Sequence, residues 1–177
     1  MAVVSAQNIE ELTAKCAGHL RQRGFRLVVA ESCTGGWLAK ILTDLPGSSD
    51  WFDRGFVTYS NRAKQTMLGV SSITLEQAGA VSEACVLEMT VGALRESGGD
   101  VAVAISGIAG PGGGSTEKPV GTVCFAWQLK GSEGVTRRYR FDGDRNQVRW
   151  QAVVCALQQL ESLLSDYPVS ILSTDDR

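Results

Sequence analysis

Two short apolar runs constrain the fold of this chain more than any other feature of its sequence. Residues 100–106, DVAVAIS, are apolar at nearly every position, which is typical of a strand buried on both faces of a sheet. Residues 25–30, FRLVVA, form a second run, and apolar residues at helical spacing precede and follow it. Because strands and helices alternate in this way, we expect a mixed sheet between helical layers.

The rest of the pattern supplies further elements. The predicted helices cover about 8–24, 37–45, 61–68, 82–98 and 144–165, and the further predicted strands cover 55–60, 120–129 and 135–141. Asn61 and Ser82 are of the residue types that cap helix starts, and Gly69 follows a predicted helix end. A glycine-rich turn at 130–134 joins the last two strands, so we expect a hairpin there.

Length and composition limit the class of protein. A chain of 177 residues, 44% of them hydrophobic, buries one core, so we expect a single domain over 1–167 and a loose tail over 168–177. The net charge of −2 gives nucleic acid and anionic membranes no general attraction. No apolar run reaches the roughly 18 residues of a membrane span, and the first residues lack the pattern of a signal peptide. We therefore expect a cytoplasmic protein that binds neither nucleic acid nor membranes.

The cysteines and the histidine give no metal pattern. Five cysteines are scattered singly, without a CxxC pair and without a histidine at metal-ligand spacing. We expect them to be small buried apolar residues in a reducing compartment. The one histidine, His19, lies in the first predicted helix with no acidic cluster beside it in the sequence. The sequence therefore predicts no metal and no other cofactor.

The segment AESCTGGWLAK, residues 30–40, places Ser32 where the first strand ends and a helix begins. Such turns expose nucleophiles and backbone N–H groups to ligands. Cys33 competes with Ser32 as nucleophile because a helix N-terminus lowers a thiol pKa. Neighbouring side chains in extended backbone point apart, so only one of the two should face a site. The other interpretation of the segment is a capped helix start with close glycine packing.

A serine nucleophile needs a base, and the single histidine on a remote helix argues against a Ser-His-Asp triad. The segment TYSNRAK, residues 58–64, supplies two other candidates, Tyr59 and Lys64. In a parallel sheet both would lie at the same edge as Ser32. Partial burial and the positive end of a helix would favour the neutral amine of Lys64. The other interpretation is a strand, a turn and a helix with a solvated lysine.

Backbone groups and arginines complete the candidate site. The N–H groups of Thr34, Gly35 and Gly36 at a helix start are candidates to bind an oxyanion. The segment 107–119, GIAGPGGGSTEKP, matches no phosphate-binding fingerprint, so it is either a flexible loop or a backbone nest with Lys118. The paired residues Arg145 and Arg149 either lie on the surface or reach the site from the last helix.

Taken together, five ordered motifs resemble the CinA C-terminal domain family. They are AESCTGGWLAKILTDLPGSSDWF, GFVTYSNRAKQTMLGV, GAVSEACVLEM, AISGIAGPGGGSTEKPVGTV and FDGDRNQVR, within about 9–164. The resemblance implies a three-layer α/β/α sandwich around a mixed, mostly parallel sheet. For the active members it implies hydrolysis of nicotinamide mononucleotide to nicotinate mononucleotide and ammonia, in pyridine-nucleotide recycling.

The resemblance also assigns roles to residues. It implies that Ser32, Tyr59 and Lys64 are catalytic, and it favours Ser32 over Cys33. It implies a nucleotide pocket lined by the glycine loop, residues 107–114, and a phosphate contact by Arg145. The residues expected to bind substrate are Ser106, Gly107, Gly110, Gly112, Gly113 and Arg145.

The chain departs from the family pattern at two positions near the expected pocket. The family usually reads Phe-x-Gly-Gly where this chain has Phe52-Asp53-Arg54-Gly55, so Arg54 is expected to narrow the site or to bind phosphate. Ser106 replaces a usual threonine before GIAGP and keeps the hydroxyl.

The resulting hypothesis is a metal-independent amidase with a small-molecule nucleotide substrate. The alternative from another class is a regulatory module that binds a nucleotide without turnover. A third interpretation, nucleic-acid binding, conflicts with the acidic charge balance. The apolar residues Trp51 and Phe52 in a predicted loop suggest a surface for a homo-oligomer.

Overall fold

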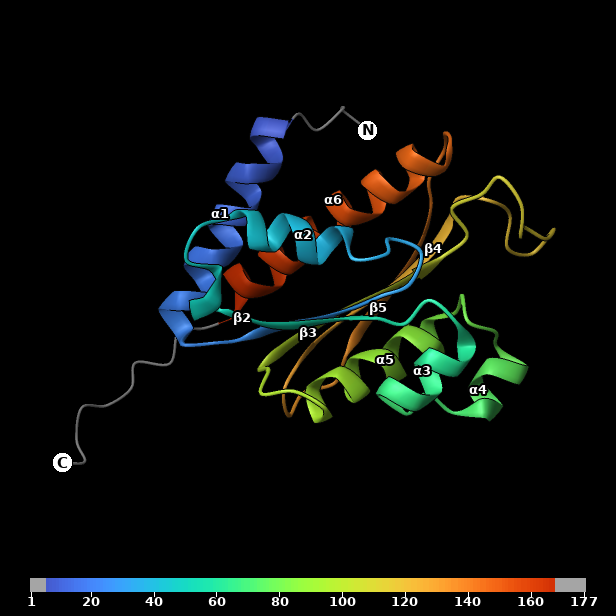
Figure 1. Cartoon of the computed structure of the whole chain (residues 1–177), viewed down its shortest axis with the longest axis horizontal. Coiled ribbons are helices and arrows are strands. Elements are labelled where there is room, and N and C mark those ends of the chain that lie inside the picture. Colours follow the sequence, from blue (N-terminus) through green and yellow to red (C-terminus); the bar gives the residue numbers. More distant parts are fainter. Residues whose placement is uncertain (1–5, 168–177) are drawn as a thin grey trace.

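The computed structural model of the chain describes residues 6–167, so the predicted tail at 168–177 lies outside the described residues. Five strands form one sheet in the order β2-β1-β3-β4-β5 (Figure 1). They are β1 (Leu27–Glu31), β2 (Phe52–Val57), β3 (Val101–Gly107), β4 (Thr122–Leu129) and β5 (Val135–Arg140). Strand β1 pairs in parallel with β2 and β3, whereas β4 is antiparallel to both β3 and β5.

Helices cover both faces of this sheet. One layer consists of α1 (Ala6–Arg23), α2 (Trp37–Asp44) and α6 (Arg145–Asp166), with the short 3-10 helix η1 (Ser48–Asp50). Figure 1 shows the other layer on the opposite face, formed by α3 (Asn61–Leu68), α4 (Ser72–Gln77) and α5 (Glu83–Arg95). The expected three-layer α/β/α sandwich with a mixed sheet is confirmed.

The two faces of β3 bury side chains of different size. Val101, Val103 and Ile105 face the larger core, which α1, α2 and α6 cover. Ala102 and Ala104 face the smaller core beneath α5. Because small side chains line that face, α5 lies close to the sheet, and α3 in turn lies close to α5. This second layer carries Lys64.

Local differences from the predicted elements have physical causes. The α3 helix is capped by the Ser60 hydroxyl, which accepts from the Ala63 N–H, so Asn61 is the first helical residue and not the cap. The short α4 helix was not predicted, because six residues are too few to show a helical period. The predicted caps Gly69 and Ser82 are confirmed.

The proposed oligomer surface at Trp51 and Phe52 is wrong in its location. Trp51 is fully buried, and its carbonyl accepts from the Leu27 N–H at 2.7 Å. Phe52 begins β2, three residues earlier than expected, and packs against the larger core. The homo-oligomer itself stays a prediction.

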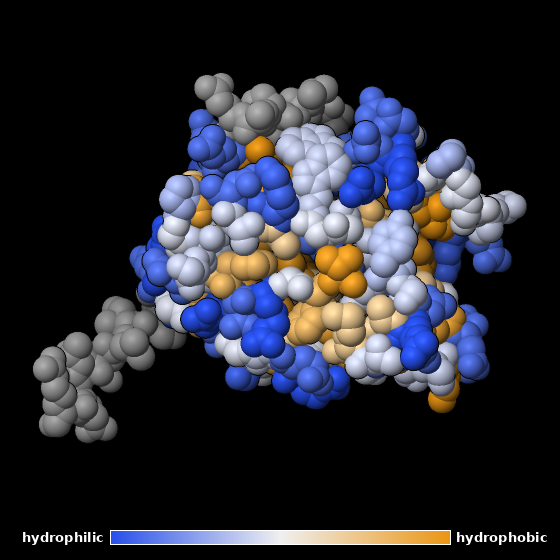
Figure 2. All heavy atoms as spheres, in the orientation of Figure 1, coloured by the Kyte–Doolittle hydropathy of each residue, from blue (hydrophilic) through white to orange (hydrophobic). Residues whose placement is uncertain are grey.

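Strand β2 is an edge of the sheet, and Gly55 and Val57 are exposed on it. Figure 2 shows the face of the molecule on which β2 lies, with apolar side chains across its middle, over the course of β2, and hydrophilic side chains around them.

Among the helices of residues 6–167, none combines the length and the apolar character that a membrane span requires. All five cysteines are buried and free, as expected.

Gly92 allows the close approach of α5 to α3. A Cβ atom at Gly92 would lie 2.0 Å from the Leu68 carbonyl oxygen, too close for any side chain. We predict that Gly92→Ala lowers the free energy of unfolding by about 1–3 kcal/mol, because backbone must move to admit the methyl group. Urea unfolding measures this loss.

The matched control is Gly18→Ala on α1, where a Cβ atom would meet nothing within 4 Å. Because alanine favours helix over glycine, this change should be neutral or stabilise by up to about 1 kcal/mol. Equal effects of the two substitutions would contradict the close contact between α3 and α5.

Candidate active site

The turn that carries Ser32 is held by a buried carboxylate. Glu31 ends β1 and is only 1% exposed. Its two carboxylate oxygens accept from the N–H groups of Gly36, Leu38 and Ala39, at 3.0, 3.1 and 2.8 Å. These N–H groups belong to the start of α2, whose N-cap, Gly36, has no side chain to do this. Glu31 therefore fixes the start of α2 relative to β1.

Sequence reasoning missed this role of Glu31. The available signal was a carboxylate directly after an apolar strand, five residues before a glycine at a helix start. Ser32 itself is fixed to the neighbouring strand, because its N–H donates to the Ile105 carbonyl at 2.9 Å.

The structure brings Lys64 to Ser32. The Lys64 Nζ lies 2.9 Å from the Ser32 Oγ and donates to the Thr58 carbonyl oxygen at 2.7 Å. Lys64 is 1% exposed and Ser32 is 8% exposed, so the contact is nearly shielded from water. Because β1 and β2 are parallel, their carboxyl ends lie side by side, and Ser32 and Lys64 follow these two ends. The arrangement suits transfer of a proton from the hydroxyl to the amine.

Burial lowers the pKa of the Lys64 amine below its usual 10.5. The cause is desolvation, which disfavours the ammonium form. Within the described residues, no carboxylate forms an ion pair with this amine. A lysine of lowered pKa can act as a general base at lower pH than a solvated lysine can.

Cys33 is a poor competitor for the role of nucleophile. Its side chain is buried, and burial raises the pKa of its thiol to about 12. A Cβ atom at Gly107 would lie 3.1 Å from the Cys33 Sγ, so the thiol packs against the end of β3. The expected effect of the helix N-terminus on this thiol is outweighed by burial.

Two of the three N–H groups expected to bind an oxyanion have acceptors within the protein. The Gly35 N–H donates to the Ser32 carbonyl at 3.0 Å, and the Gly36 N–H donates to Glu31. Among the described residues, the N–H groups of Cys33 and Thr34 have no acceptor. Thr34 is fully buried. The free donors of this turn are therefore Cys33 and Thr34.

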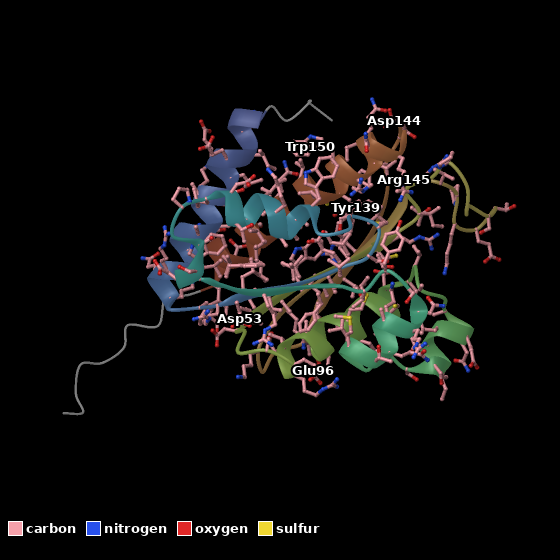
Figure 3. The ribbon with its side chains drawn as sticks, viewed as in Figure 1. Asp53, Glu96, Tyr139, Asp144, Arg145 and Trp150 are labelled. Carbon is pink, nitrogen blue, oxygen red and sulfur yellow. The ribbon has the colours of Figure 1, made fainter. Side chains whose placement is uncertain are left out.

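Tyr59 lies at the rim of the site. It is 60% exposed, and its hydroxyl accepts from Arg145 at 2.8 Å. A second nitrogen of Arg145 donates to the Gly110 carbonyl at 2.7 Å. Figure 3 shows Arg145 at the start of α6, beside the loop that joins β3 to β4. Within the described residues, no hydrogen bond joins Tyr59 to Ser32 or Lys64.

The glycines of the loop that follows β3 differ in how close they lie to the other predicted site residues. Gly107 ends β3 next to Cys33, and Gly110 contacts Arg145, whereas Gly112 and Gly113 lie in an exposed part of the loop. The Ser106 hydroxyl is buried and donates to the Ala80 carbonyl at 2.8 Å, so in this structure it ties β3 to the loop before α5.

Two cationic side chains have backbone partners. The Lys118 amine donates to the Ala78 carbonyl at 2.6 Å. Arg149 reaches the turn that carries Ser32, where it donates to the carbonyl oxygens of Cys33 and Thr34. The interpretation of Arg149 as a simple surface residue is therefore wrong.

No described cluster of three or more His, Cys, Asp or Glu side chains is placed to hold a metal ion. A cavity of about 390 Å³ lies between α1, α2 and α6, with Trp37 and Trp150 in its wall. None of the predicted site residues lines it.

Comparison with known proteins assigns the chain to a family. The sequence profile of the CinA C-terminal domain matches residues 9–164. The chain belongs to the CinA C-terminal domain family. It is 58% identical over 150 residues to the nicotinamide-nucleotide amidohydrolase PncC of Escherichia coli K12, which covers 85% of this chain and 91% of that protein.

Longer and solved relatives extend the comparison. A CinA-like protein of Syntrophobacter fumaroxidans is 50% identical over 163 residues, 92% of this chain and 38% of that protein. The crystal structure of the competence damage-inducible protein A from Klebsiella pneumoniae superposes with a TM-score of 0.87 at 46% identity, over 90% of this chain and 99% of that chain.

Within this CinA C-terminal domain, Arg54 does not narrow the site. It pairs with Val28 near the start of β1, whereas Ser32 follows the end of that strand. Its guanidinium donates to Asp53 and to the Glu96 carbonyl. Figure 3 shows Asp53 and Glu96 well away from Arg145. The expectation that Arg54 lies in the pocket is therefore wrong, because the strand carries it to the other end of the sheet.

The lowered pKa of Lys64 predicts how stability depends on pH. The unfolded chain holds a proton on this amine up to about pH 10.5, whereas the folded chain releases it at lower pH. Between the two pKa values the unfolded state binds more protons, so stability increases with pH there. We predict that wild type gains stability relative to Lys64→Met across this window, by at most about 1.4 kcal/mol per pH unit.

Urea unfolding of both proteins at a series of alkaline pH values measures this difference. Subtracting the Lys64→Met curve removes the titration of the other lysines. A difference that stays constant with pH would show that the Lys64 amine titrates normally.

Proposed function

We propose that this chain hydrolyses the carboxamide of nicotinamide mononucleotide to nicotinate mononucleotide and ammonia. The observation that carries the proposal is the 2.9 Å contact between the buried Lys64 amine and the Ser32 hydroxyl. The choice of substrate is supported by the relatives named nicotinamide-nucleotide amidohydrolase, at 58% identity over most of both chains. Amide hydrolysis is the reaction that a serine and a neutral lysine are suited to perform.

In the first half of the reaction, the Ser32 Oγ attacks the carboxamide carbon while the Lys64 amine takes the hydroxyl proton. Negative charge then develops on the carboxamide oxygen. The N–H groups of Cys33 and Thr34 are the donors proposed to stabilise it. The tetrahedral intermediate collapses as Lys64 returns its proton to the leaving nitrogen, and ammonia departs. The product is an ester between Ser32 and the nicotinoyl group.

In the second half, water attacks this ester, and Lys64 takes a proton from the water. The second tetrahedral intermediate releases the Ser32 oxygen, which recovers the proton from Lys64. The net reaction consumes one water and yields one carboxylic acid and one ammonia. No other reactant is required.

Arg145 and Tyr59 are proposed to bind the nucleotide at the rim. Arg145 is exposed, carries a charge that complements phosphate, and contacts Gly110 of the glycine loop. Because the Tyr59 hydroxyl is bonded to Arg145 and not to Ser32 or Lys64, we assign Tyr59 to substrate orientation and not to proton relay. Gly107, Gly112 and Gly113 are proposed to let backbone approach the nucleotide.

We predict that wild type releases ammonia from nicotinamide mononucleotide without added metal, and that Ser32→Ala and Lys64→Ala reduce kcat by about a thousandfold or more. A coupled assay of ammonia measures this. The control is Lys40→Ala, because Lys40 is an exposed lysine paired with Asp44 on α2. Full activity in Ser32→Ala would overturn the mechanism. Nucleotide binding without ammonia release by folded wild type would favour the regulatory module.

We predict that Arg145→Ala raises KM for nicotinamide mononucleotide about tenfold, because one charge-assisted contact to phosphate is lost. Turnover of nicotinamide riboside, which has no phosphate, should change much less. Arg137→Ala is the control, since Arg137 is an exposed arginine that bonds the adjacent Thr136 carbonyl. An equal loss with both substrates would argue against a phosphate contact.

A further inference from the structure

Arg149 links α6 to the turn that carries the nucleophile. Its Nε donates to the Cys33 carbonyl at 3.0 Å, and a terminal nitrogen donates to the Thr34 carbonyl at 2.8 Å. A guanidinium is a rigid planar fork, so it fixes the orientation of both carbonyl groups at once. The two residues it holds are the two whose N–H groups have no acceptor among the described residues.

The geometry of the peptide bond connects these facts. The Cys33 carbonyl and the Thr34 N–H belong to one planar peptide, and in a trans peptide they point in opposite directions. A guanidinium on the carbonyl therefore determines that the N–H points away from Arg149. Thr34 is fully buried, and a buried N–H without an acceptor is rare in folded proteins. The Thr34 N–H therefore has no partner among the described residues that would compete with an oxygen atom of a bound molecule.

Charge strengthens the same donor. A cation at the carbonyl oxygen draws electron density toward that oxygen and away from the nitrogen of the same peptide, so the N–H becomes a better donor. The shielded surroundings strengthen this electrostatic effect. The guanidinium is held in place from its other side, since it lies 5.1 Å from the centre of the Trp37 ring.

We propose that Arg149 is a positioning residue for the oxyanion: it orients and polarises the Thr34 N–H toward the oxygen that becomes negative when Ser32 attacks. The inference rests on the proposed function, because it takes Ser32 as the nucleophile. Negative charge on that oxygen is greater in the transition state than in the bound substrate, so the contribution of Arg149 falls mainly on kcat and not on KM.

The test uses a reaction of Ser32 that does not require the natural substrate. An alkyl fluorophosphonate phosphonylates an active serine: the Oγ–P bond forms, the P–F bond breaks, fluoride leaves and the hydroxyl proton passes to the base. The phosphonyl oxygen becomes negative during attack, as the carboxamide oxygen would. Intact-mass spectrometry follows the rate of labelling, with Ser32→Ala identifying the site.

We expect Arg149→Gln to slow labelling by about tenfold to a hundredfold and to lower kcat for nicotinamide mononucleotide similarly. KM and the Kd of nicotinate mononucleotide, which has no tetrahedral oxyanion, should change by less than about threefold. Arg149→Lys keeps the charge but loses the fork, so its labelling rate should lie between wild type and Arg149→Gln. It also carries the test if Arg149→Gln does not fold.

The matched control is Arg21→Gln, which removes another arginine that donates to a loop carbonyl, that of Gly47, and should label at the wild-type rate. Wild-type labelling by both Arg149 variants would overturn the proposal, as would equal losses in labelling and in product binding. If wild type is labelled at Ser32 but releases no ammonia, the proposed substrate is wrong while the role of Arg149 is still judged by labelling. Failure of wild type to be labelled would overturn both.

Discussion

The buried contact between the Lys64 amine and the Ser32 hydroxyl results from the topology of the sheet and from the packing of α3 and α5 against it. It forms because β1 and β2 run in parallel, so that the turns after both strands meet at one edge of the sheet. Burying an amine costs free energy, which is reduced when the amine is neutral and donates to the Thr58 carbonyl. The small side chains beneath α5 and the close approach at Gly92 bring the second helical layer near enough to bury it.

The turn that carries Ser32 is held by two side chains of opposite charge. The Glu31 carboxylate gathers N–H groups at the start of α2, and the Arg149 guanidinium binds two carbonyl groups of the turn itself. Together they bind five backbone groups: the N–H groups of Gly36, Leu38 and Ala39, and the carbonyl groups of Cys33 and Thr34. The N–H groups of Cys33 and Thr34 remain without an acceptor among the described residues. One short turn can therefore supply both the proposed nucleophile and its proposed oxyanion donors.

The sequence predicted the layers, most strand positions and the convergence of Ser32 with Lys64, because these follow from apolar periodicity and from parallel topology. It did not predict which N–H groups stay free, since Gly35 and Gly36 are satisfied by groups that only the folded turn brings close. The support by Glu31 was missed for the same reason, and for Arg149 the sequence left open both a surface position and a reach to the site. The position of Arg54 was wrong because the family pattern that contains it lies close in sequence to the site residues of the next turn. In the structure β2 carries Arg54 to the opposite end of the sheet from Ser32.

An NMR titration of the Lys64 Nζ tests directly whether this amine is the base. The protein carries ¹⁵N-labelled lysine side chains, and the Lys64 signal is assigned by its loss in Lys64→Met. This amine should titrate below its usual pKa of 10.5, and kcat/KM should rise with pH along the same titration. An amine that keeps its proton up to about pH 10.5 would mean that Lys64 is charged at the pH of turnover, and would contradict its proposed role as the base.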